Sequence, residues 1–243
     1  MKKYILFSII LCFASPLLAQ DESSETSISE HFLGNFEEDW MIVLGFGRSG
    51  TKVDHTETSS VAGFSALGVV NDVGYTSYSL SLIKELFHQS RLSLSLIANA
   101  NYNMGGQSGS ENNIDFSEDL SGFQYGLSFS VNLNYFAYNM KLQPYLGAGF
   151  QMENSTLDMD YVSGANNIKT TYNYTGTIGQ ANLGVRILDP NVGLMSFLNI
   201  SYVSAIGETI DAKVNVGGSE GVLDVVDVSK SNIHASLGFG FIF

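Results

Sequence analysis

The chain has 243 residues, with 11 Lys or Arg and 24 Asp or Glu, which gives a formal net charge of −13. Charged residues make up only 14% of the chain and hydrophobic residues 44%, which excludes an intrinsically disordered protein. The acidic balance disfavours a nucleic-acid partner, because binding phosphates requires a basic surface. Aromatic residues reach 12%, mostly Phe and Tyr, and these residue types favour strands.

The first segment, residues 1–19, has the organisation of a signal peptide for export. Two lysines are followed by an apolar run at 4–13, and Ala19 is a small residue before the expected cleavage site. About ten apolar residues are too few to span a bilayer as a helix, which disfavours an uncleaved anchor. The single cysteine, Cys12, lies within this segment, so the exported chain is expected to lack disulfides. Residues 20–39 form an acidic, serine-containing tail.

From residue 40 onward, apolar and polar residues alternate with the period of two that is typical of strands. Eight segments show this alternation, at 40–47, 77–82, 92–99, 123–135, 142–151, 180–187, 198–202 and 233–243. The intervals between them are alternately short and long, and the long ones predict polar loops at 49–74, 103–120, 153–173 and 205–230. Residues 61–70 fit the first loop or a ninth strand; an even strand count keeps both termini on one side and favours the loop.

The polar positions of these segments hold Ser, Gly, Asn and Gln with almost no charge. Because the wet face of a soluble sheet normally carries Lys and Glu, we interpret these positions as a narrow lumen and the apolar positions as facing lipid. Aromatic residues near the strand ends match interfacial girdles. A secreted lipocalin-like barrel is the alternative, which the missing charges disfavour. The predicted fold is all-β, an eight-stranded antiparallel up-and-down transmembrane β-barrel over residues 40–243.

Two segments resemble the small OmpA/OmpX-type outer-membrane β-barrels of Gram-negative bacteria. Residues 144–150 (PYLGAGF) resemble a strand common in that family, and the terminal LGFGFIF, with Phe239, Phe241 and Phe243, resembles its barrel assembly signal. The resemblance implies an outer-membrane location, contact with outer-membrane lipid and lipopolysaccharide, and recognition by the barrel assembly machinery. It specifies the fold better than the function, because this architecture hosts pores, adhesins and enzymes.

Five residues on the polar face are candidate site residues. Glu85, Arg91 and Arg186 lie near the short turns, where they form either an ion-pair gate in the lumen or structural pairs at its rim. His234 and Ser236 resemble the His-x-Ser pair of outer-membrane lipid A deacylases, but no Glu follows to orient the histidine. We therefore expect them to be polar lumen residues and predict no catalytic residue.

The predicted loops are acidic, and carboxylate clusters can bind Ca²⁺ or Mg²⁺. No twelve-residue calcium loop is present in the sequence, so a solvated surface is expected, with no metal and no cofactor. The expected role is non-enzymatic, structural or in surface interaction with an extracellular ligand or host surface through the long loops. A narrow pore for small solutes is the second hypothesis, and a lipid A-modifying hydrolase is the third.

Overall fold

The computed structural model describes residues 40–59, 71–89, 91–111, 114–137, 140–163, 166–189 and 191–243. Its strands are β1 (Trp40–Ser59), β2 (Asn71–Gln89), β3 (Leu92–Glu111), β4 (Ile114–Leu133), β5 (Tyr135–Ala137), β6 (Met140–Ser163), β7 (Asn166–Asp189), β8 (Leu194–Val216) and β9 (Ser219–Ile242). The described residues form no helix that is long and apolar enough to cross a membrane. The predicted signal peptide, the acidic tail and residues 61–70 lie outside the described residues.

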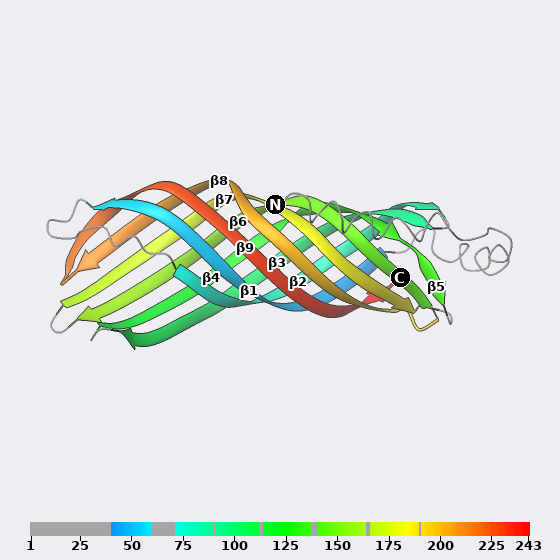
Figure 1. The fold of residues 1–243 in the computed structure, drawn as a ribbon, viewed down its shortest axis with the longest axis horizontal. Helices are drawn as coiled ribbons and strands as arrows, with labels where there is room; N and C mark the ends of the chain where they lie inside the picture. Colours follow the sequence, from blue (N-terminus) through cyan, green and yellow to red (C-terminus); the bar gives the residue numbers. More distant parts are fainter. Residues whose placement is uncertain are drawn as a thin grey trace, which may run out of the picture. The chain divides into compact units, whose positions relative to one another are not determined.

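The strands form one antiparallel sheet that closes on itself (Figure 1). Strands that are neighbours in sequence pair with each other, β1 pairs with β9, and β4 pairs with β6 across the short β5. β5 continues β4 beyond a break at Asn134, and both pair with β6. Counted as one strand, β4 and β5 make the barrel eight-stranded. Trp40 and Phe243 exchange two backbone hydrogen bonds of 2.9 Å, which join the first strand of the barrel to the last. The predicted eight-stranded antiparallel barrel is confirmed.

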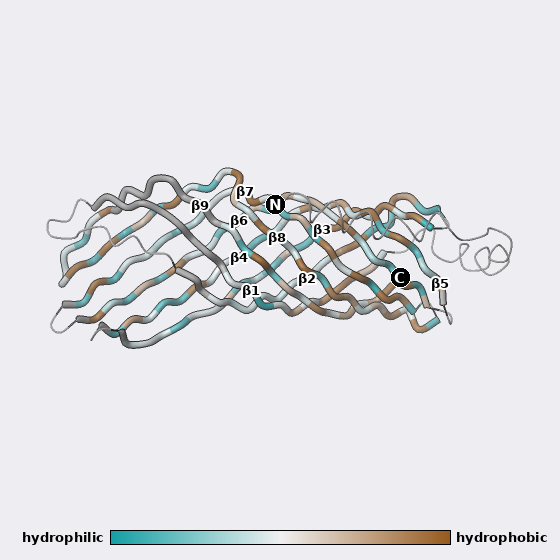
Figure 2. Tube along the Cα trace, in the orientation of Figure 1, coloured by the Kyte–Doolittle hydropathy of each residue, from teal (hydrophilic) through white to brown (hydrophobic). Residues whose placement is uncertain are grey.

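In the half of the barrel that contains these two ends, apolar residues face outward and small polar residues face inward. Hydrophobic and hydrophilic residues alternate along the strands (Figure 2). On β6, Leu142 and Phe150 are exposed, whereas Gln143 and Gln151 are buried in the interior. The apolar outward positions of β6 run from Leu142 to Met152, which at ~3.3 Å per residue and a ~40° tilt is roughly 25 Å of height. This height matches the lipid-facing band of outer-membrane barrels, so the protein spans the membrane as a β-barrel.

The predicted long loops are wrong for most of their length. Paired or extended strands occupy residues 49–59, 71–74, 103–111, 114–120, 153–163, 166–173, 205–216 and 219–230. β8 and β9, for example, are joined by a tight turn at Gly217 and Gly218, whose φ angles of 55° and 93° favour glycine. We call this part of the barrel, beyond the apolar band and away from the end that holds Trp40 and Phe243, the extension. The longest connection of the chain, between Ser59 and Asn71, belongs to this end, and in outer-membrane barrels the longer connections are extracellular.

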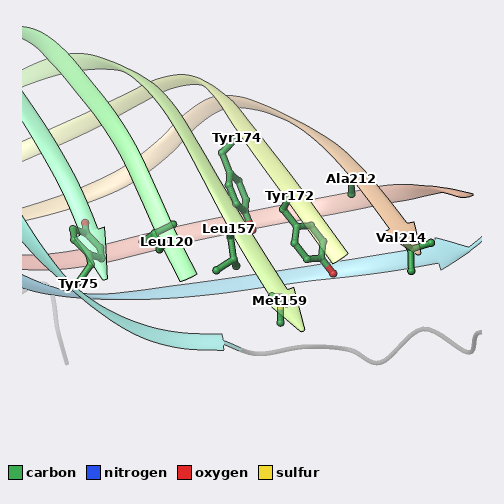
Figure 3. Packing of buried hydrophobic residues seen from close by; sticks show 8 residues of the cluster. All are labelled: Tyr75, Leu120, Leu157, Met159, Tyr172, Tyr174, Ala212 and Val214. Atoms are coloured by element: carbon green, nitrogen blue, oxygen red, sulfur yellow. The ribbon is translucent and has the colours of Figure 1, made fainter. Parts of the chain in front are cut away.

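The reason for the wrong prediction is a reversal of polarity between inside and outside. In the extension, Leu157 and Met159 of β6 and Tyr172 of β7 are buried in the interior, and Asp158 is exposed. Their side chains project from the inner faces of the strands (Figure 3). Water replaces lipid outside the extension, so apolar side chains gain by turning inward, as in a soluble barrel. The period of two continues, but the apolar positions exchange parity.

In β8, a β-bulge changes which residues face the interior. Ile206 is an extra residue opposite the Thr177–Ile178 step of β7. Odd-numbered residues such as Ser201 are buried before the bulge, and even-numbered residues such as Ala212 are buried after it. The bulge therefore directs the apolar residues at the end of β8 into the extension.

Candidate functional site in the lumen

The lumen next to the short turns is filled by polar side chains that are at most 6% exposed. We call this layer the periplasmic plug, and its residues are Glu85, Ser93, Ser95, Ser130, Asn132, Asn134, Lys141, Gln143 and Arg186. Eight strands leave an interior just wide enough for side chains to fill. The plug therefore closes this end of the lumen by packing.

Charged groups in the plug are held by a continuous hydrogen-bond network. The Nζ of Lys141 lies 3.1 Å from both carboxylate oxygens of Glu85. Gln143 links Glu85 to Arg186, because its Nε2 donates to Glu85 (3.2 Å) and its Oε1 accepts from Nη1 of Arg186 (3.2 Å). Arg186 also donates to Oδ1 of Asn132 (3.1 Å) and stacks 4.1 Å from the centre of the Tyr145 ring. Buried charges persist only when paired and hydrogen-bonded in this way.

The structure brings two of the three candidate ion-pair residues into the plug. Glu85 and Arg186 are both there, but Gln143 lies between them, and the cation on Glu85 is Lys141. Arg91 lies in the turn before β3, where its backbone carbonyl accepts a 3.0 Å hydrogen bond from the break between β4 and β5. Sequence reasoning missed Lys141, although it shares its odd-numbered face with Gln143 and could have been found by parity.

A chamber of about 80 Å³ lies in the lumen above the plug. Its lining includes Asn99, Gln151 and Phe197. The buried atoms Asn99 Oδ1, Gln151 Oε1 and His234 Nε2 have no hydrogen-bond partner within the protein. Buried polar atoms are normally satisfied, and a water needs only roughly 10–15 Å³ of such volume. The chamber is therefore large and polar enough for several waters that would satisfy these atoms.

His234 and Ser236 both line this chamber. The Nδ1 of His234 lies 3.5 Å from Oγ of Ser201 on β8, and no hydrogen bond between His234 and Ser236 occurs among the described contacts. The structure thus places both residues in the lumen without forming a nucleophile–base pair. A base must lie within hydrogen-bond reach of its nucleophile, so this geometry is that of polar lumen residues.

Phe197 is a lumen residue that sequence reasoning missed, because it is an aromatic residue at an inward position of a mostly polar face. A Cβ atom added to Gly45 would lie 2.9 Å from its ring, and one added to Gly238 would lie 2.4 Å from it. Gly45 and Gly238, which belong to the Gly-Phe-Gly segments at 45–47 and 238–240, therefore make room for the ring. A third, Gly47, faces the imidazole of His234, where a Cβ would lie 2.2 Å from Nε2.

The extension closes the lumen at its other end. Eight residues, which we call the extracellular core, are 1–7% exposed: Tyr75, Leu120, Leu157, Met159, Tyr172, Tyr174, Ala212 and Val214 (Figure 3). The rings of Tyr172 and Tyr174 stack with centroids 6.4 Å apart. In the described part of the chain, the lumen thus contains two packed layers of opposite chemistry with the chamber between them.

The outer face of the extension is acidic. Among the residues whose exposure the structure describes, the exposed or half-exposed charged residues on this face are Asp115, Asp119, Asp158, Asp160, Asp211 and Glu220 against Lys169 and Lys213. Lys169 pairs with Asp160 at 3.0 Å. Within the described ranges, no three His, Cys, Asp or Glu side chains are grouped so that they could hold a metal ion. This surface therefore presents mainly negative charge to solvent.

No protein-family model matches the chain, and no curated protein matches it. Similar solved structures include the attachment invasion locus protein Ail of Yersinia pestis in complex with the heparin analogue sucrose octasulfate (17% identity, TM-score 0.39, covering 85% of this chain and 99% of that chain). Others are a major outer membrane protein from Thermus thermophilus (13%, 0.47, 84% and 99%) and OprG from Pseudomonas aeruginosa (15%, 0.42, 85% and 96%). These proteins are small outer-membrane barrels, as the sequence resemblance implied; identities this low concern the fold alone.

Proposed function

We propose that the protein is a non-enzymatic, non-conducting outer-membrane barrel that acts through the outer face of its extension. The observation that carries this proposal is the double closure of the lumen by the periplasmic plug and the extracellular core. The side chains of each layer are at most 7% exposed, and the hydrogen-bonded plug contains a buried ion pair. In this proposal the interaction surface consists of paired strands and not of the expected loops, and paired strands present a more rigid surface.

The two other hypotheses are less well supported by this geometry. A pore for small solutes needs a continuous aqueous path, and both packed layers oppose one. A lipid A-modifying hydrolase needs a nucleophile and base in contact, whereas His234 contacts Ser201 and lies between the closed layers. The roles in assembly of Phe239, Phe241 and Phe243 stay a proposal; their exposed rings, 59–64% accessible, are available to a partner or to lipid.

Conductance tests the closure directly. The protein is refolded into planar bilayers, and folding is checked by the different gel mobility of unheated and boiled samples. We expect a folded barrel without conductance steps. Steady steps from the wild-type protein would overturn the proposal and make the pore its function.

The charge of the extension indicates the sign of its extracellular partner. The side chains described on its outer face, six acidic residues against two lysines, favour a cationic partner, and attraction of this kind weakens with salt. We expect cells that display the protein to bind fluorescent polylysine at low salt and to bind heparin no better than cells without it. The triple variant Asp115→Asn, Asp158→Asn, Asp211→Asn should lose most polylysine binding, and unchanged binding would contradict the surface proposal.

A further inference from the structure

A groove of about 420 Å³ crosses the outer face of β3, β4, β6 and β7. Its apolar lining consists of Tyr102, Phe123, Tyr125 and Met152, each between 44% and 52% exposed. Phe123 and Tyr125 hold their rings 6.0 Å apart and tilted by 37°. The groove therefore presents aromatic ring faces and edges to whatever surrounds the barrel.

The other side of the groove is polar. Its outward residues Ser121, Asn154, Thr156 and Thr175 carry hydroxyl or amide groups. Glu153 also lines the groove, but its side chain is buried in the lumen. Asn154 lies opposite Phe123 in the β4–β6 register, so the polar and aromatic sides meet directly. Outward residues change from apolar to polar at this level, where a barrel passes from hydrocarbon into the lipid headgroups.

The electrostatics of the groove select against phosphate. None of the described residues that line it is Lys or Arg. Asp119 and Asp158 lie opposite one another in register immediately beyond it, and both are exposed. Arg48 on β1 shares the register row of Ser121 and Thr156, but it does not line the groove. Lys213 on β8 shares the row of Asp119 and Asp158, with Thr171 between, and it does not line the groove either. An anionic headgroup in the groove would therefore meet two carboxylates and no cation among the lining residues.

We propose that this groove binds the neutral sugar headgroup of an outer-leaflet glycolipid. A sugar ring has an apolar face of C–H groups, which carry partial positive charge and pack against the negative faces of aromatic rings. Its hydroxyls match the amide and hydroxyl groups opposite. The aromatic side of the groove is continuous with the lipid-facing band, so the acyl chains of a bound glycolipid remain in the bilayer. The inference rests on the placement of the barrel in the membrane and is independent of the proposed cationic partner.

The test is lipid selection by the refolded protein. The protein is placed in phosphatidylcholine nanodiscs that contain equal amounts of digalactosyl diacylglycerol, phosphatidylglycerol and lipid A, and retained lipids are measured by native mass spectrometry. We expect preferential retention of the galactolipid. Tyr125→Leu and Asn154→Ala should each reduce its retention about fivefold, as expected for the loss of one aromatic or hydrogen-bond contact.

The matched control is Phe46→Leu. Phe46 is an exposed aromatic residue whose row continues through Tyr78 and Tyr102, yet it lies outside the groove, so its substitution should leave retention unchanged. Equal retention of the three lipids by the wild-type protein overturns the proposal. Preference for lipid A that disappears with EDTA also overturns it, because it indicates cation bridging by Asp119 and Asp158. These outcomes are read on the wild-type protein and do not depend on any variant folding.

Discussion

Lys141 and Glu85 form an ion pair in which Lys141 is completely buried. Removing one partner of such a pair leaves an uncompensated charge without water around it. We expect Lys141→Met to lower the free energy of unfolding by roughly 3–5 kcal/mol. Urea titration of the protein in lipid vesicles, followed by the fluorescence of Trp40, measures this change.

The double variant Glu85→Gln, Lys141→Met distinguishes the charge from the packing. It removes both charges and keeps similar volumes, so it should recover most of the lost stability. A double variant as unstable as the single one would show that Lys141 stabilises the plug through its other contacts and not through Glu85.

Gly238 is a second residue whose identity follows from its neighbours. A Cβ at this position would lie 2.1 Å from the backbone oxygen of Leu44 and 2.4 Å from the Phe197 ring. Because the backbone oxygen belongs to the paired β1 strand and cannot turn aside, Gly238→Ala should destabilise the barrel by roughly 1–3 kcal/mol. Gly207 is the matched control, since no atom lies within 4 Å of its Cβ position. Equal urea midpoints for the two alanine variants would contradict this steric explanation.

At the scale of strands, the alternation of residues such as Gln143 and Leu142 predicted which face is wet and which faces lipid. It predicted this because one rule, apolar outward, holds wherever lipid surrounds the barrel. The same rule failed at Leu157 and Asp158, where the solvent changes from lipid to water and the rule reverses. The ion pair in the plug could not be predicted from the sequence either. Which cation contacts Glu85 depends on the register of strands that are distant in sequence.

The bulge at Ile206 gives the prediction at this scale. Deleting Ile206 joins Ala205 directly to Gly207, and these two residues already pair with Ile178 and Thr177 of β7. The deletion should therefore remove the bulge and keep Ala212 and Val214 in the extracellular core. Inserting one alanine between Ile210 and Asp211 should instead turn Asp211 and Lys213 inward and Val214 outward. We expect the insertion variant to be cut by trypsin at Lys213 and the deletion variant to resist, while both keep the heat-dependent gel mobility of the membrane-spanning part. Equal resistance of the two variants would contradict the register argument.

For the whole molecule, the two closures act in series. Opening one layer leaves the other across the path, so conductance should appear only when both are opened. We expect no conductance from Glu85→Ser, Lys141→Ser, Arg186→Ser, and none from Tyr172→Ser, Tyr174→Ser. The combination of all five substitutions should give steady steps in planar bilayers, and conductance from either set alone would show that the other layer does not seal the lumen.

The reversal of polarity between the apolar band and the extension also has a consequence for assembly. The residues of the extracellular core meet only after the strand ends have crossed the membrane, so the free energy of burying them is released on the far side alone. Sliding back would separate this cluster and return charged residues such as Asp158 and Lys169 to the hydrocarbon. Packing of the extension thus favours the inserted state over any partly inserted one, which gives insertion a direction without any external source of energy.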